Sequence, residues 1–211
     1  MPHKRPVQDR SKFTIQAIYD AYVRIWRRDG PESVTTRGVA EEAGFAVGTL
    51  YEYFPNKAAL HSGYVRHAMD RLHERIDHDV IAETGLGWSE GLRRLVNLSC
   101  GVFPQAPYFD VAMLNMENEI ADLKRHQQAF NALSDKWFEA ISSWPDLQPA
   151  PSRERVTTLL LAVWGARRYH LLVSPDGIYP AGWVDQLVEI CQRALAPAAG
   201  VGAVDDPAPA S

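Results

Sequence analysis

Hydrophobic residues recur every three or four positions through most of the chain, and no segment shows the sustained period-two alternation of a half-buried strand. This pattern predicts an all-α fold. A first amphipathic helix is expected after Ser11, whose hydroxyl can cap it, and is ended by Asp29-Gly30-Pro31. Its inward stripe consists of Ile15, Ile18, Tyr22, Ile25 and Trp26.

Two short helices joined by a tight turn follow. The first follows Thr35 and Thr36, with Val39, Ala40 and Ala43 facing inward, and Gly44 provides a left-handed stop. Residues 47–54 form the second, in which Leu50 and Phe54 lie four apart and face inward. Two short helices around a glycine turn, braced by a preceding helix, are typical of a helix-turn-helix unit, whose second helix enters the DNA major groove.

The outward positions of this unit suit contact with DNA. Gly48 permits close approach of the backbone, whereas Thr49, Tyr51 and Tyr53 carry hydroxyls that can bind phosphate. Thr36 and Lys57 each stand at a helix start, where backbone amides favour an anion. The guanidinium of Arg37 matches the O6/N7 pair of guanine. These residues therefore form a candidate nucleic-acid interface.

At this point the chain resembles the tetracycline-repressor (TetR) family of bacterial transcription regulators. The matching residues are TTRGVAEEAG at 35–44 and GTLYEYFPNK at 48–57. The resemblance covers about residues 11–60. It implies a homodimer whose amino-terminal domains bind a near-palindromic double-stranded DNA operator and whose variable carboxy-terminal domains bind a small effector. It also implies phosphate contacts from Thr36, Tyr51 and Lys57, and an approach to bases by Arg37, Val47, Gly48 and Thr49.

Several residues depart from the family pattern or leave alternatives open. Phe45 and Ala46 stand where the family often has a valine and a small hydroxyl residue, so the usual side-chain cap of the second short helix is missing. Val47 can offer only an apolar contact, and Glu52 either accepts from cytosine N4 or remains solvated. Tyr51 and Tyr53 could instead be packing aromatics. The charges Arg24, Arg27, Arg28, Glu41 and Glu42 are expected to form a solvated face.

One long amphipathic run from Lys57 to about residue 81 predicts a helix of some 25 residues that connects two domains. Proline and glycine clusters then divide the rest of the chain, so that five or six helices, this long one included, are expected after the first three. We expect a DNA-binding domain at 1–56 and a helical effector-binding and dimerisation domain at 57–195. Residues 196–211, rich in Ala, Pro and Gly, are expected to be disordered.

The larger domain is rich in aromatic residues and methionine, which suit either a solid core or a pocket for a flat apolar or aromatic ligand. Helices that surround the effector in the family are expected to supply the pocket. The predicted pocket residues are Phe103, Met113, Met116, Trp137, Trp164 and Tyr169. Asn115, Glu117, Glu119 and His170 are possible polar anchors, with surface or satisfied core positions as the alternative.

Residues 156–173 are apolar almost all round, and residues 184–195 carry an apolar stripe. These two helices could pair with their symmetry mates in a four-helix dimer bundle, or form an intramolecular core. The histidines of the long helix are spaced by six, six and five, which scatters them around it and indicates surface residues rather than a metal site. They are His61, His67, His73 and His78.

Charge and composition narrow the function further. The net charge is −4, but residues 1–60 carry nine Lys/Arg against seven Asp/Glu. Lys4, Arg5, Arg10 and Lys12 form a basic arm that either follows phosphates or is a solvated terminus. Only two cysteines, no membrane span and no catalytic motif are visible. We expect a cytoplasmic, non-enzymatic, effector-responsive repressor without metal or cofactor; the alternative is a helical ligand-binding dimer with weak or lost DNA binding.

Overall fold

The computed structural model describes residues 5–174 and 179–196, with side chains from residue 10 onward, and within these ranges it confirms the all-α fold. The helices are α1 (Arg5–Asp29), α2 (Thr36–Ala43), α3 (Val47–Tyr53), α4 (Lys57–Ile76), α5 (Trp88–Ser99), α6 (Val111–Ile120), α7 (Leu123–Ser142), α8 (Arg153–Val173) and α9 (Trp183–Leu195). Lys4 and the predicted disordered segment after Ala196 lie outside the described residues.

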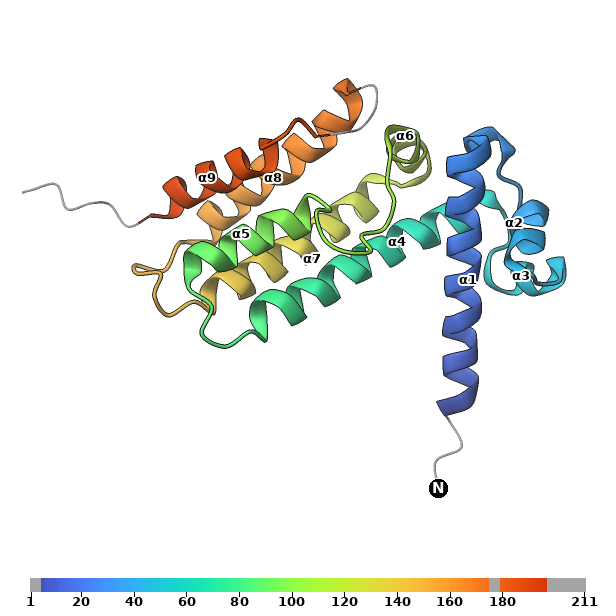
Figure 1. Cartoon of the computed structure of the whole chain (residues 1–211), viewed down its shortest axis with the longest axis horizontal. Helices are drawn as coiled ribbons and strands as arrows, with labels where there is room; N and C mark the ends of the chain where they lie inside the picture. The colour runs from blue at the N-terminus through green and yellow to red at the C-terminus, as the bar shows by residue number, and fades with distance from the viewer. Residues whose placement is uncertain (1–4, 175–178, 197–211) are drawn as a thin grey trace, which may run out of the picture.

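The helices form two groups connected by α4 (Figure 1). In the first group, α1 crosses the amino-terminal end of α4, and α2 and α3 lie on the side of α1 that faces away from the larger group. A π-helical turn at Asp77–Ile81 continues α4 directly. The predicted 25-residue run is therefore confirmed, and in the described ranges six α-helices follow α3, as expected.

Side chains and backbone conformation define the short helices of the first group. The Thr35 hydroxyl accepts from the Gly38 backbone N–H at 3.0 Å and caps α2. Gly44 ends this helix with φ 77°, the left-handed conformation expected. Ala46 precedes α3 and offers no side-chain cap, which confirms the departure seen in the sequence. Tertiary contacts must therefore stabilise the start of α3.

The predicted start of α1 is wrong. The helix begins at Arg5, so Ser11 lies inside it and its hydroxyl donates to the Tyr53 hydroxyl, at an oxygen–oxygen distance of 3.3 Å. Because the helix extends this far, Arg10 and Lys12 lie exposed on α1 instead of on a separate basic arm. The apolar stripe could not reveal this extension, since it begins only at Ile15.

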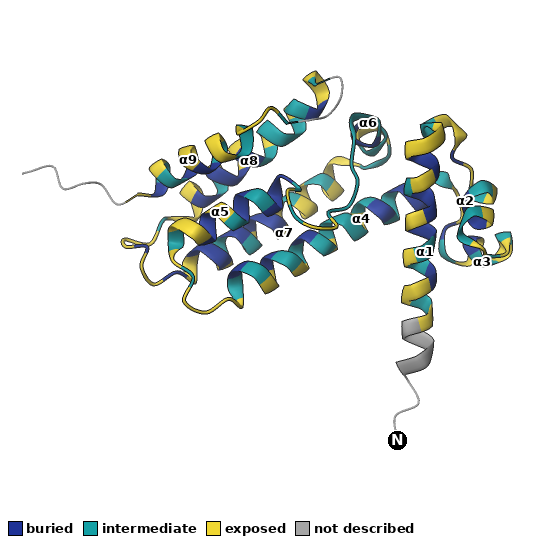
Figure 2. Cartoon of the chain, viewed as in Figure 1, coloured by how far each residue is buried: buried dark blue, intermediate teal, exposed yellow. Residues whose placement is uncertain are grey.

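The buried residues, whose backbone is dark blue in Figure 2, form two hydrophobic cores. The first joins α1, α2 and α3, but it also includes Leu60 and Tyr64 of α4 and the fully buried Met113 of α6. The second lies around Trp137 and joins the later part of α4 to α5, α7, α8 and α9. The boundary expected at 56/57 therefore separates two segments of sequence without separating the two cores.

Asp110 connects the two halves through polar contacts. Its Oδ1 accepts from the Met113 backbone N–H at 2.8 Å and so caps α6. Its Oδ2 accepts from Trp26 Nε1 at 2.9 Å and from the Tyr108 hydroxyl at 2.8 Å. Because Trp26 lies on α1, this one carboxylate links the beginning of α6 to the helix that braces the helix-turn-helix unit.

Candidate nucleic-acid interface and adjoining cavity

The helix-turn-helix unit is held against α1 by its apolar face. Val39 and Ala40 of α2, Leu50 of α3 and Phe54 are buried, as the sequence predicts. Burying these side chains supplies most of the stability of two helices that are only eight and seven residues long. The opposite face of α3 is left exposed.

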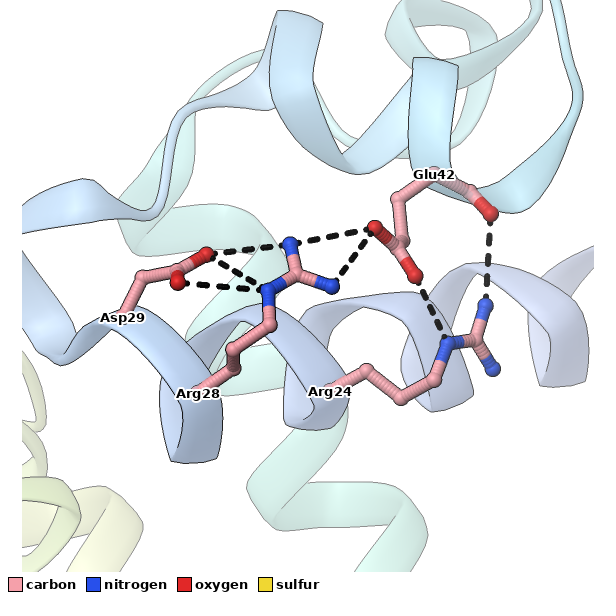
Figure 3. A network of polar contacts seen from close by, with 4 residues as sticks. All are labelled: Arg24, Arg28, Asp29 and Glu42. Carbon is pink, nitrogen blue, oxygen red and sulfur yellow. Dashed lines mark hydrogen bonds and ion pairs between the residues drawn. The ribbon is translucent and has the colours of Figure 1, made fainter.

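An ion-pair network fastens α2 to α1 (Figure 3). Glu42 accepts from Arg24 Nε at 2.9 Å, and both terminal nitrogens of Arg28 lie 3.2 Å from its Oε2. Arg28 also contacts Asp29 at 3.0 Å. Hydrogen bonds from Arg24 and Arg28 lower the pKa of Glu42. Arg24 and Arg28 are exposed, as expected of a solvated face, and they also pair with Glu42 between α1 and α2.

Several predicted DNA contacts lie exposed without a structural partner. Arg37 and Glu52 are exposed, and neither side chain forms a hydrogen bond or ion pair with any residue that the structure describes. Tyr51 is half-exposed at 50%, and its hydroxyl lies 3.1 Å from the Thr36 hydroxyl. The structure thus brings together two residues that the sequence assigns to phosphate contact.

Gly48 has no packing reason to be glycine. A Cβ at this position would meet nothing within 4 Å, so the surface in front of α3 is open. Val47 and Tyr53 are half-buried and pack against the first core, whereas Thr49 is half-buried on α3. These positions present a small, mixed surface that a nucleic-acid groove could approach.

Lys57 lies at the start of α4, as predicted, but its ammonium group already has a partner. Its Nζ donates to the Pro31 carbonyl oxygen at 2.7 Å and ties α4 to the turn after α1. The Asn56 side chain caps the same helix by accepting from the Ala59 backbone N–H at 2.8 Å. The phosphate role of Lys57 stays a prediction.

The sequence of this region matches a known family. The model for bacterial regulatory proteins of the tetR family matches residues 18–62. Residues 18–62 are therefore similar to the TetR family. The chain is also 48% identical over 60 residues to the HTH-type transcriptional repressor KstR of Mycolicibacterium smegmatis, a match that covers 28% of each chain. The similarity to this curated relative therefore spans less than a third of its length.

Solved structures extend the similarity in fold to most of the chain. A TetR-family transcriptional regulator from Streptomyces coelicolor is 19% identical, with a TM-score of 0.61, over 88% of this chain and 97% of that one. The Thermus thermophilus repressor FadR, in complex with lauroyl-CoA, is 22% identical, with a TM-score of 0.56, over 93% and 100% of the two chains. At these identities the likeness concerns the fold.

The larger half of the chain contains a cavity of about 370 Å³, within the range of small-molecule sites. It lies between α4, α6, α7 and α8. Its apolar lining includes Val65, Met69, Phe130, Leu133 and Trp164. Exposed charged residues, Arg66, Asp70 and Arg125, also line it. A smaller cavity of about 60 Å³ shares several of these residues, so the two adjoin.

Of the six predicted pocket residues, two line these cavities. Trp164 lines both and Phe103 the smaller one. Trp137 is fully buried in the second core, where its Nε1 donates to the Ser99 hydroxyl at 3.1 Å. Met113 is fully buried in the first core and Met116 packs against it, whereas Tyr169 is 67% exposed. Sequence periodicity shows that a face is apolar but not whether it meets a core, a cavity or solvent.

Among the possible polar anchors, Glu117 lines both cavities. Its carboxylate lies 3.3 Å from Arg168 Nη1 and 3.7 Å from His126 Nδ1. Asn115 and Glu119 are exposed, and the His170 ring packs on Tyr179 and Trp183, with centroids 4.8 and 5.2 Å away. Glu117 and Arg168 thus place an ion pair beside the apolar lining.

His61 corrects the expectation of surface histidines along α4. It is fully buried and lines the larger cavity, and its Nδ1 lies 2.8 Å from the Tyr22 hydroxyl of α1. Its Nε2 has no hydrogen-bond partner among the described residues. Burial lowers the pKa of His61 to about 4, although the Met113 backbone carbonyl opposes this shift. His61 is therefore neutral at pH 7, and the scattered spacing gave no sign of its burial.

An apolar strip lies exposed along α8. Leu161, Tyr169 and Leu172 are 56%, 67% and 50% exposed, and their spacing places them on one side of the helix. Gly165 lies between them, and a Cβ there would meet nothing within 4 Å. In the described part of the chain no helix is long and apolar enough to cross a membrane.

Proposed function

We propose that this chain is a homodimeric transcriptional repressor of the TetR family that binds a near-palindromic operator and leaves it when a small, largely apolar effector binds. The observation that carries the proposal is the open surface of α2 and α3. There Arg37 is exposed without a partner, and Gly48 faces empty space. The relative KstR is named a transcriptional repressor, which supports the same role for the matching region.

Each exposed residue has a distinct task in the proposed complex. Arg37 donates two hydrogen bonds to the O6 and N7 atoms of guanine, which distinguishes bases by about 1 to 3 kcal/mol. The neighbouring hydroxyls of Thr36 and Tyr51 bind one phosphate and fix the position of the unit on the duplex. Gly48 lets the backbone of α3 approach the bases.

The exposed strip of α8 supplies the proposed dimer contact. Exposing Leu161, Tyr169 and Leu172 to water is unfavourable, and covering them with the same face of a second copy would lower the free energy. The bare position of Gly165 allows the two α8 helices to approach closely. Such a dimer would bind two half-sites about 34 to 36 Å apart, which is one helical turn of DNA.

Helix α4 provides a route from effector to operator. It begins beside the helix-turn-helix unit, and its later residues line the cavity. An effector that moves α4 would change the distance between the two copies of α3. A coupling free energy of about 1 to 3 kcal/mol would weaken operator binding some 5- to 150-fold. The complex of FadR with lauroyl-CoA supports an effector with a long apolar part.

Fluorescence anisotropy with DNA fragments from the neighbourhood of its own gene tests the proposal. We expect Arg37→Ala to weaken binding and to relax preference at one base pair, whereas Tyr51→Phe weakens binding to all sequences alike. Arg155→Ala removes an exposed arginine at the start of α8 and serves as the control. If the native protein shows no sequence preference at low salt, DNA binding is refuted and the helical ligand-binding dimer becomes the better account.

A further inference from the structure

His61 connects the cavity to the DNA-binding half. Its side chain lines the cavity, but its Nδ1 is bound to Tyr22 on α1, inside the first core. Both side chains are fully buried. Among the described residues, no other hydrogen bond or ion pair joins a cavity-lining side chain to α1. Any group that binds the free side of the imidazole therefore acts on a ring already coupled to α1.

The chemistry of the pair determines what the free side offers. Burial raises the pKa of Tyr22, so its hydroxyl keeps its proton, and Nδ1 is the only hydrogen-bond partner that the described residues provide for it. The hydroxyl therefore donates to Nδ1. A neutral imidazole carries one proton, which must then lie on Nε2. Nε2–H is thus a buried donor at the cavity wall that makes no well-formed hydrogen bond to the described residues; the Met113 backbone carbonyl acts on the ring only enough to oppose the fall in its pKa. A ligand acceptor with better geometry would relieve this costly arrangement.

We propose that His61 is an effector-contacting residue: its Nε2–H donates a hydrogen bond to a carbonyl-type oxygen of an otherwise apolar effector, and its Nδ1 transmits the resulting displacement to Tyr22. The coupling to operator release rests on the function proposed above. The binding contact does not, because it can be measured without DNA. The ligand class follows from one unpaired donor beside an apolar lining that includes Val65, Met69 and Trp164.

Nuclear magnetic resonance of the ring nitrogens tests the donor assignment without any ligand. Histidine labelled with ¹⁵N, with His61→Gln used to assign the signal, is expected to show a protonated Nε2 and a bare Nδ1 at pH 7. The opposite tautomer would overturn the proposal, because Nε2 would then need a donor from the ligand.

Two pairs of isosteric probes test the contact. Dodecan-2-one is compared with 2-methyldodec-1-ene, and 2-acetylnaphthalene with 2-isopropenylnaphthalene; in each pair a carbonyl oxygen is replaced by CH₂. Affinities are measured by calorimetry and by quenching of tryptophan fluorescence. In at least one pair the ketone should bind about tenfold more tightly, since it satisfies a buried donor. Equal binding within both pairs overturns the contact, and absence of binding by all four probes overturns the ligand class.

Substitutions connect this preference to His61. In His61→Leu the ratio between ketone and alkene should fall to about one, whereas His61→Gln, whose amide can still donate, should keep a preference. His73→Leu is the matched control: His73 lies on α4, lines the same cavity and also has a buried Nε2 without a partner among the described residues. It lies about three turns beyond His61 along α4, away from the contact with Tyr22. A retained tenfold ratio in His61→Leu would refute the assignment.

The proposed transmission of the displacement from His61 to Tyr22, called the relay below, is tested with separate variants. Tyr22→Phe should keep the ketone preference while the ratio of operator affinities without and with ketone moves toward one. If His61→Leu fails to fold because Tyr22 loses its acceptor, the double variant Tyr22→Phe/His61→Leu removes both polar groups and restores an apolar contact. If the ketone releases Tyr22→Phe from the operator as fully as it releases the native protein, the relay is refuted. If Tyr22→Phe fails to bind the operator even without ligand, the substitution has damaged the DNA-binding unit itself.

Discussion

The substitution Gly48→Ala distinguishes two explanations for the glycine in α3: internal packing or close approach to DNA. If Gly48 were needed for internal packing, alanine would destabilise the fold. The structure leaves the space beyond its Cα empty to 4 Å, so Gly48→Ala should instead raise the free energy of unfolding by up to about 1 kcal/mol, because alanine has the higher helix propensity. Urea denaturation followed by circular dichroism measures this directly.

The same methyl group should harm DNA binding if the backbone of α3 approaches the bases. The added methyl group would hold α3 away from the groove, and at least one base contact, worth about 1 to 3 kcal/mol of binding free energy, would be lost. Operator affinity should therefore fall at least about tenfold while the protein becomes no less stable. Unchanged operator affinity, within about twofold, in a fully folded Gly48→Ala protein would refute the placement of Gly48 against DNA.

Gly63→Ala provides the contrasting control. A Cβ at this position would lie 2.7 Å from Phe54 Cε1 and 2.8 Å from the Tyr19 hydroxyl. We expect a loss of about 1 to 3 kcal/mol in stability from this crowding. Any fall in operator affinity should then follow the unfolded fraction, which distinguishes a packing glycine from a DNA-facing one.

Three further outcomes are expected. Gly91→Ala should lose about 1 to 3 kcal/mol of stability in urea denaturation, since its Cβ would lie 2.5 Å from the buried ring of Trp144; native-like stability would contradict this packing. Tyr169→Asp should shift the protein toward monomer in sedimentation velocity, and an unchanged dimer would exclude the α8 strip as the interface. Because burial lowers the pKa of His61 to about 4, the unfolded chain takes up a proton near pH 6.5 that the folded ring does not accept. The free energy of unfolding should therefore fall by up to about 3 kcal/mol as the pH drops from about 6.5 to 4, and should not depend on His61 above pH 6.5. An equally steep pH dependence in His61→Gln would contradict this.

The sequence predicted the helix-turn-helix unit closely because its signals are local. Gly44 must adopt positive φ, Leu50 and Phe54 lie one turn apart, and Pro55 interrupts the chain. The start of α1 was missed because Arg5 to Arg10 carry too few apolar residues to show a stripe. A helix can extend beyond its buried face when nothing stops it.

The cavity was harder to predict because it depends on how helices from distant parts of the sequence are spaced. Trp137 and Trp164 are both large aromatics on helices of the larger half, yet one fills a core and the other lines a cavity. His61 was hidden for a related reason: its burial results from α1 and α6 closing over α4, which no local pattern records. Charge on Glu42 likewise gave no sign of its pairing with Arg24.

Met113 constrains how such proteins can be recombined. A graft that joins residues 1–56 to the sensor half of another relative would remove this methionine from the first core, together with the Asp110 bond to Trp26. The chimera would have a void in the first core, next to the helix-turn-helix unit, unless the new half supplied a side chain that fills the same space. Exchange of effector-binding halves during evolution is therefore easiest when α6 is transferred together with the DNA-binding half, or when both parent proteins already have an equivalent of Met113.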